Sequence, residues 1–195
     1  MTAVFAYRHV LHESSEAERS SSVAICFELV INFGDNIDAA RAAALTRTTP
    51  RPTTFAVGDH HIPLHTALLR ADGPFIELSL VPVAVGHRVA LDGTIPRFDL
   101  TADELTELGR QLYGLLAGFD GYVAAKVGWD PEDMIDPVEL RTHWLDELEA
   151  GDLDGVVLCD AFYEELGLGD NYDVFRPGYR WVPYRGESPS SLIAD

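Results

Sequence analysis

The chain is poor in three things that mark large classes of protein: cysteine, basic residues and long apolar runs. Its 2 cysteines, Cys26 and Cys159, lie in apolar, strand-like segments, where a buried reduced thiol is the commonest state, so we expect no disulfide. The longest uncharged apolar stretches, such as 78–86, fall well short of the roughly 18 residues that span a bilayer. We therefore expect no membrane segment.

The shortage of basic residues argues against nucleic acid as a ligand. The chain has 14 Lys and Arg against 32 Asp and Glu, for a net charge of −18, whereas phosphate binding needs a basic surface. The imbalance is local, because residues 99–173 hold 20 of the acids and only 3 basic residues, a net of −17, and the rest of the chain carries −1. This predicts an acidic face that either only keeps the protein soluble or receives a basic partner.

The N-terminal stretch MTAVFAYRHVLHESSEAERSSS has no basic start followed by an apolar core and a small-residue cleavage site. We therefore expect no secretory signal and a cytoplasmic location. The length of 195 residues and the 47% of hydrophobic residues are typical of one globular domain.

The residue patterns predict the α+β class, with one domain, a mixed and mostly antiparallel sheet, and helices packed mainly on one face. The odd positions of 23–33 are all apolar, while Glu28 and Asn32 lie at even ones, which predicts a strand with one buried face. An alanine-rich helix is expected over 37–45, and 53–98 is expected to be rich in strands.

The second half is expected to mix helices with short strands. A capping box, Thr101 with Glu104, opens a helix whose leucines recur at helical spacing up to Phe119. The later expected elements are a strand at 122–127, one helix from Asp136 to Gly151, a strand at 155–159, a helical turn to Leu166 and a strand at 179–184. We expect 1–20 and 187–195 to be poorly ordered. The predicted core comprises Phe27, Leu29, Ile76, Leu78, Leu108, Leu112, Trp144 and Val157.

No motif for catalysis, a metal or a cofactor stands out, so none of these is predicted. The histidines at 60, 61 and 65 are the nearest candidates for metal ligands. On a strand, however, His61 and His65 lie about 13 Å apart, too far to share one ion. An alternative stays open: a small enzyme or small-molecule-binding protein with its site near the His60–His65 segment.

Two segments, GWDPED at 128–133 and RPGYRWVPYRG at 176–186, together with the acidic one-domain α+β layout, resemble the small immunity proteins encoded beside bacterial polymorphic toxins. The resemblance covers mainly the second half of the chain and indicates no particular family. It implies a bacterial protein that binds a toxin domain and blocks its active site, often by presenting carboxylates to a basic cleft.

The charge pattern and the resemblance together predict a non-enzymatic binding protein that uses residues 128–173 against a basic protein partner. Outer carboxylates are expected to steer the association, and a tryptophan in the same loop is the candidate anchor at the centre of the contact. The predicted partner-binding residues are Trp129, Asp130, Glu132, Asp133, Asp170 and Asp173.

Overall fold

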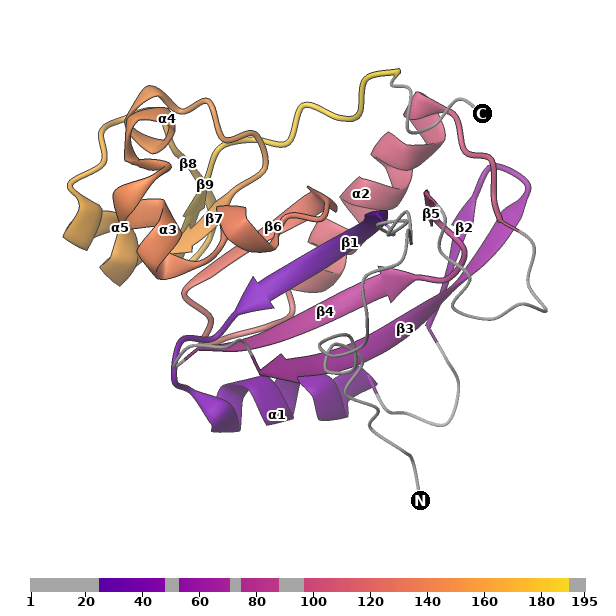
Figure 1. The fold of residues 1–195 in the computed structure, drawn as a ribbon, viewed down its shortest axis with the longest axis horizontal. Coiled ribbons are helices and arrows are strands. Elements are labelled where there is room, and N and C mark those ends of the chain that lie inside the picture. Colours follow the sequence, from indigo (N-terminus) through magenta and orange to yellow (C-terminus); the bar gives the residue numbers. More distant parts are fainter. Residues whose placement is uncertain (1–24, 48–52, 71–74, 88–96, 190–195) are drawn as a thin grey trace, which may run out of the picture.

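The structure is a computed structural model that describes residues 25–47, 53–70, 75–87 and 97–189 (Figure 1). The strands are β1 (Ile25–Asn32), β2 (Thr54–Val57), β3 (His60–Arg70), β4 (Ile76–Pro82), β5 (Gly86–His87), β6 (Ala124–Trp129), β7 (Val157–Cys159), β8 (Asp173–Arg176) and β9 (Tyr179–Trp181). The helices are α1 (Ile37–Arg47), α2 (Ala102–Leu116), the 3-10 helix η1 (Glu132–Met134), α3 (Pro137–Thr142), α4 (Leu145–Ala150) and α5 (Asp160–Leu166).

The strands form one sheet in the order β2-β3-β4-β1-β6-β7-β9-β8, and β5 pairs with the start of β1. At its centre β1 pairs with β6, from Phe27 opposite Trp129 to Asn32 opposite Ala124. This pairing joins the two halves of the chain into a single α+β domain, as predicted. Every pair among the described strands is antiparallel, so the expected parallel component of a mixed sheet is not found there.

One face of the sheet carries the main core, beneath α1 and α2. The odd residues of β1 point to this face, and Leu29 packs there with Leu108 and Leu112 of α2, all three fully buried. The predicted capping box is present, because Thr101 accepts a hydrogen bond from the Glu104 N–H at 3.3 Å and the Glu104 carboxylate accepts one from the Thr101 N–H at 2.9 Å. Seven of the eight predicted core residues lie in this cluster; the exception is Trp144.

Helices also cover the opposite face of the sheet, contrary to the prediction that they pack mainly on one face. The even position Val30 of β1 faces this side and belongs to a second buried cluster, against which Trp144 packs while partly exposed. The members of this cluster that lie on strands or helices are Val30, Ala124, Leu140, Leu148, Leu158 and Phe162. Both faces need cover because β6 and β7 are apolar at consecutive positions.

The structure has two helices, α3 and α4, where the sequence predicted one from Asp136 to Gly151, although both predicted ends are present. Asp136 caps its start by accepting from the Val138 N–H at 2.6 Å, and Gly151 ends it with φ 72°, in the left-handed region. In between, the Thr142 hydroxyl donates to the Val138 carbonyl at 2.8 Å, a contact that bends helices, and Trp144 leaves helical geometry with φ −111° and ψ 9°.

In the first half of the chain the second face of the sheet also buries polar side chains. Asn32 is fully buried and Glu28 is 5% exposed, so the prediction that β1 has only one buried face was wrong. Partners make this burial possible: the Asn32 amide donates to the Glu77 carboxylate at 3.2 Å, and its oxygen accepts from the Gly34 N–H at 2.8 Å.

The end of the described chain, which is yellow in Figure 1, runs along α2. The Glu187 N–H donates to the Thr106 hydroxyl at 2.8 Å. Of the termini expected to be poorly ordered, residues 187–189 are therefore described, while 1–20 and 190–195 lie outside the described residues. Among the described helices, none has the length and apolar character needed to cross a membrane.

Candidate functional site

The exposed carboxylates of residues 99–173 outnumber the exposed basic side chains of that segment by twelve to two, the two being Arg110 and Arg141. They fall on two sides of the sheet. On the side of α2 lie Asp99, Asp103, Glu107 and Asp120; on the side of α3, α4 and α5, or on β8, lie Asp133, Asp146, Glu149, Asp152, Glu164, Glu165, Asp170 and Asp173. The second group is the surface that the sequence predicts for a partner.

Two of the predicted binding residues are engaged inside the molecule. The Trp129 ring packs edge-to-face on Phe27 with centroids 5.3 Å apart, against the main core. Asp130 has φ 43°, in the left-handed region, and its carboxylate accepts the Cys26 N–H at 2.8 Å. These contacts join the end of β6 to the start of β1, which gives both residues a structural role.

The predicted acids do not form a single cluster. Asp173 lies on β8, which is three strands away from β6. Across the sheet, Asp173 pairs with Trp181, Trp181 pairs with Val157, and Val157 pairs with Ala125 of β6. Asp130 lies five residues beyond Ala125, so about 20 Å separates the two carboxylate groups at usual sheet spacings. The Asp170 and Asp173 end of the surface is therefore distinct from the η1 end, where Asp133 is exposed and Glu132 partly buried.

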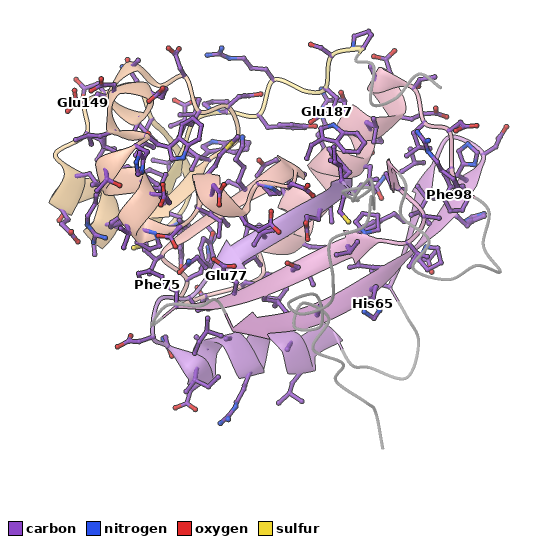
Figure 2. The ribbon with its side chains drawn as sticks, in the orientation of Figure 1. His65, Phe75, Glu77, Phe98, Glu149 and Glu187 are labelled. Atoms are coloured by element: carbon purple, nitrogen blue, oxygen red, sulfur yellow. The ribbon has the colours of Figure 1, made fainter. Side chains whose placement is uncertain are left out.

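Four exposed acids lie on the segments that meet at the C-terminal end of α4. The Asn171 amide donates to the Glu149 carbonyl at 3.1 Å, which holds the loop between α5 and β8 against this helix end. We call the exposed acids that flank this contact in the chain the α4 patch: Glu149, Asp152, Asp170 and Asp173. Figure 2 shows Glu149 at this end of the molecule and Phe98 at the other end.

The α4 patch is electrostatically uncompensated within the described residues. Three acids elsewhere in the segment do have an arginine partner, since Arg141 binds Glu165 at 2.7 Å, Arg180 lies 3.5 Å from Asp160 and Arg176 pairs with Asp120. The patch has no such pair in the described ranges, and α4 has no basic residue in its last turn. Glu149 and Asp152 lie at the C-terminal end of α4, where the negative end of the helix dipole disfavours a carboxylate.

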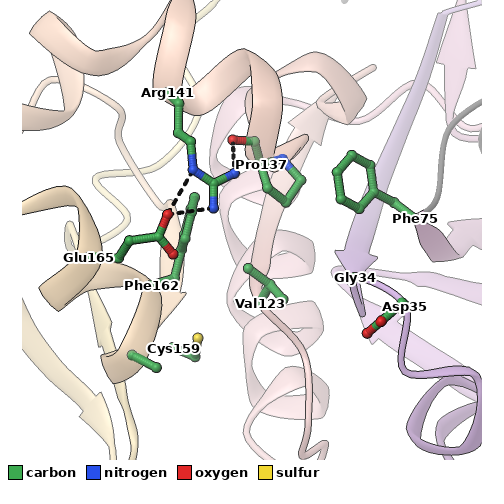
Figure 3. Close-up of a pocket in the computed structure, with 10 residues that line it drawn as sticks. Gly34, Asp35, Phe75, Val123, Pro137, Arg141, Cys159, Phe162 and Glu165 are labelled. Carbon is green, nitrogen blue, oxygen red and sulfur yellow. Dashed lines mark hydrogen bonds and ion pairs between the residues drawn. The ribbon is translucent and has the colours of Figure 1, made fainter.

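A cavity of about 390 Å³ lies beside this surface, between the start of α1 and the helices α3 and α5 (Figure 3). Such a volume is within the range of small ligand sites. Its residues come from separate parts of the chain: Gly34, Asp35, Phe75, Val123, Pro137, Arg141, Cys159, Ala161, Phe162 and Glu165. Sequence reasoning missed the site; the available signal was Arg141, one of only three basic residues in the acidic segment.

Arg141 forms one wall of the cavity and is held from three directions. Its guanidinium donates to the Glu165 carboxylate at 2.7 and 2.9 Å and to the Pro137 carbonyl at 2.7 Å. It also lies over the Phe162 ring, 4.7 Å from the centroid. An aromatic ring and a carboxylate together thus bind this arginine, as expected from its planar charged group.

Cys159 lines the same cavity as a free, partly exposed thiol at the start of α5. Burial raises the pKa of this thiol, and the weaker hydrogen bonds from the Phe162 and Ala161 N–H groups oppose the shift. The thiol is therefore mostly protonated at neutral pH, which makes it a poor nucleophile.

The structure places the histidine segment of the alternative hypothesis on a single strand. His60, His61 and His65 all lie on β3, the strand that the sequence favoured, and His60 packs on Phe98 with centroids 5.3 Å apart. His61 and His65 are exposed. None of the three lines either the cavity near Arg141 or the small one near Trp129.

One group of described residues has the chemistry to hold a cation. A ligand atom from each of Cys26, Glu28 and Asp130 lies within 4.8 Å of the others, where β1 begins and β6 ends. A thiol with two carboxylates suits a divalent transition metal. The Asp130 carboxylate already accepts the Cys26 N–H, so a purely structural role accounts for its position as well.

Comparison with models of protein families, with curated proteins and with solved structures finds no match. We therefore infer the function from the surface, the cavity and the charges described above.

Proposed function

We propose that this protein is a non-enzymatic binding protein whose acidic surface over residues 128–173 receives a basic protein partner. The resemblance in layout to immunity proteins makes a toxin domain in the bacterial cytoplasm the first partner to test. In this proposal the carboxylates attract the partner before contact and then neutralise its basic site.

The α4 patch is the observation that carries the proposal. Its four acids are exposed and have no ion pair within the described residues, and Glu149 and Asp152 lie at the C-terminal end of α4, which is the negative end of the helix dipole. A basic partner would neutralise these carboxylates, so binding would remove an unfavourable electrostatic interaction that the isolated protein retains. Solubility alone requires negative charge somewhere on the surface, without any need to concentrate it at a helix C-terminus.

The test compares two variants that lose the same charge at different places. The first carries Glu149→Gln, Asp152→Asn, Asp170→Asn and Asp173→Asn in the α4 patch. The control carries Asp38→Asn, Asp59→Asn, Asp103→Asn and Glu107→Gln, all exposed acids outside the proposed surface. Asp130 is left unchanged because it has a structural contact with the backbone of Cys26.

A partner is captured from the native cell, purified, and measured against both variants by calorimetry and stopped flow over a range of salt concentrations. We expect the patch variant to lose about tenfold or more in association rate, with a weaker salt dependence, and the control to lose much less. Equal losses would mean that only net charge matters. An unchanged affinity in the patch variant would show that the acids are merely solvated.

A further inference from the structure

The wall of the cavity opposite Arg141 repeats the combination of an aromatic ring and a carboxylate. The Ile76 N–H donates to the Gly34 carbonyl at 2.8 Å, and this backbone pairing brings Phe75 beside Asp35. Figure 3 shows both side chains across the cavity from Arg141 and Glu165. No cation or ring of the described residues pairs with Asp35 or Phe75.

We infer that this cavity receives one arginine side chain of the basic protein partner, with its guanidinium on Phe75 and Asp35. The identity of the partner rests on the proposed function, whereas the chemistry of the cavity does not. On the facing wall, the contact of Arg141 with Phe162 and Glu165 shows that this kind of surface binds a guanidinium.

The rest of the lining fits the aliphatic part of an arginine. Val123, Pro137 and Ala161 also line the cavity and offer apolar surface to a methylene stem. Its volume of about 390 Å³ leaves room for one long side chain. Arginine is one of the residue types enriched in binding hot spots, where side chains fill pockets near the centre of an interface.

The charges of the lining favour a cation over an anion. Asp35 and Glu165 are negative, and Arg141, the one basic lining residue, is already bound to Glu165. An anion would therefore meet an unpaired carboxylate at Asp35. Arginine is favoured over lysine because its planar group can stack on Phe75 and bind a carboxylate with two hydrogen bonds at once.

Cys159 makes the inference measurable without a partner. The probe is N-acetyl-L-arginine amide at millimolar concentration, and its control is N-acetyl-L-citrulline amide, which has a similar shape and no charge. The rate of alkylation by iodoacetamide is followed by peptide mass spectrometry at alkaline pH, because the Cys159 thiol has a raised pKa. Cys26 in the same molecule lies outside the cavity and reports any general effect.

We expect the arginine amide to slow alkylation of Cys159 at least threefold, to leave Cys26 unchanged, and to act far more strongly than the citrulline amide. Asp35→Asn should remove most of this protection while leaving the melting temperature unchanged. Equal protection by the citrulline amide would overturn the inference, because it would indicate a pocket for neutral small molecules. Equal slowing of both cysteines, or of neither, would overturn it as well.

A second measurement links the cavity to the partner. Asp35→Asn with Phe75→Leu should weaken partner binding at least tenfold without changing the melting temperature. If this variant binds normally while the α4 patch variant binds weakly, the inference about the cavity is wrong and the proposed function stands. If neither variant loses affinity, the proposed function and the inference about the partner's arginine are both wrong.

Discussion

The two halves of the sheet differ on one face and agree on the other. Under α1 and α2, residues from both halves form one apolar core that contains Leu29 and Val127. On the opposite face the second half is apolar, with Leu158 beneath the short helices, whereas the first half buries the polar pair Asn32 and Glu77.

This difference shows how one sheet can provide both stability and a site. The shared apolar face holds the halves together, so the other face is less constrained in its composition. The cavity near Arg141 lies where the apolar and polar parts of that second face meet, between Gly34 of the first half and Val123 of the second. Substitutions on the two faces test this division.

The largest expected effect is on the shared face. Leu112 is fully buried in the main core, so Leu112→Ala should lower the free energy of unfolding by about 2 to 5 kcal/mol. Denaturation with urea measures this, and Val138→Ala, at a half-exposed position, serves as the control. A loss below about 1 kcal/mol would show that the main core does not determine stability.

The polar pair is expected to have the next largest effect. Asn32→Ala removes the hydrogen bonds with Glu77 and Gly34 and should cost roughly 1 to 3 kcal/mol. In Asn32→Asp the new carboxyl faces Glu77 in a buried site, so its pKa rises above the unfolded value. This variant should therefore be least stable at neutral pH and recover as the pH falls through the raised pKa. A pH-independent loss would contradict the assigned contact.

The cap of α2, the helix that covers both halves, should contribute less. Thr101→Ala is expected to cost about 0.5 to 2 kcal/mol in thermal or urea denaturation. Hydrogen bonds from the Thr101 backbone and side chain lower the pKa of Glu104. The Glu104 carboxylate therefore contributes its full stabilisation of the folded protein above the unfolded pKa of about 4.3. This stabilisation is lost as the pH falls through the lower pKa of the folded state. Glu104→Gln should remove this pH dependence, and an unchanged profile would mean that the carboxylate does not form the box in solution.

The α4 patch should give a smaller effect of opposite sign. Each neutralised acid should stabilise the isolated protein by a few tenths of a kcal/mol at low salt, because repulsion among the acids and with the helix end disappears. Calorimetry at low and high salt measures the melting temperature. Added salt should stabilise the wild type more than the patch variant; an equal response would indicate that the acids are too far apart to interact.

The smallest expected effect is that of metal removal. We expect a chelator to leave the melting temperature unchanged and elemental analysis of dialysed protein to find no stoichiometric metal. A clear loss of stability would contradict this, and the group formed by Cys26, Glu28 and Asp130 would then be the place to look, with Cys26→Ser as the diagnostic variant.

Local patterns were enough to predict most of the elements. Alternation located β1, and the capping box located α2, because both signals depend only on neighbours in the chain. The short strand β8, Asp173–Arg176, was missed because four residues carry too little pattern. The burial of Asn32 and Glu77 was missed for another reason: period-two reasoning assigns polar residues to solvent, and a cross-strand hydrogen bond cannot be read from one strand.

The candidate site was less predictable than the fold. Exposure of Asp133, Asp170 and Asp173 agrees with the surface that the sequence predicted, since charged residues in loops and at edges usually reach water. The internal contacts of Trp129 depend on the register between β1 and β6. The cavity could not be predicted because its lining comes from distant segments that only the folded sheet brings together.

The central pairing of β1 with β6 also determines the order in which the protein can fold during synthesis. Cys26 and Asp130, which meet at one end of this pairing, lie 104 residues apart in the chain. While the ribosome makes the intervening residues, β1 can pair with β4, but its other edge has no strand to bind. An apolar strand with an open edge recruits other chains, and such long-range pairing is slow. We therefore expect the growing chain to be most prone to association with other chains before Trp129 has emerged.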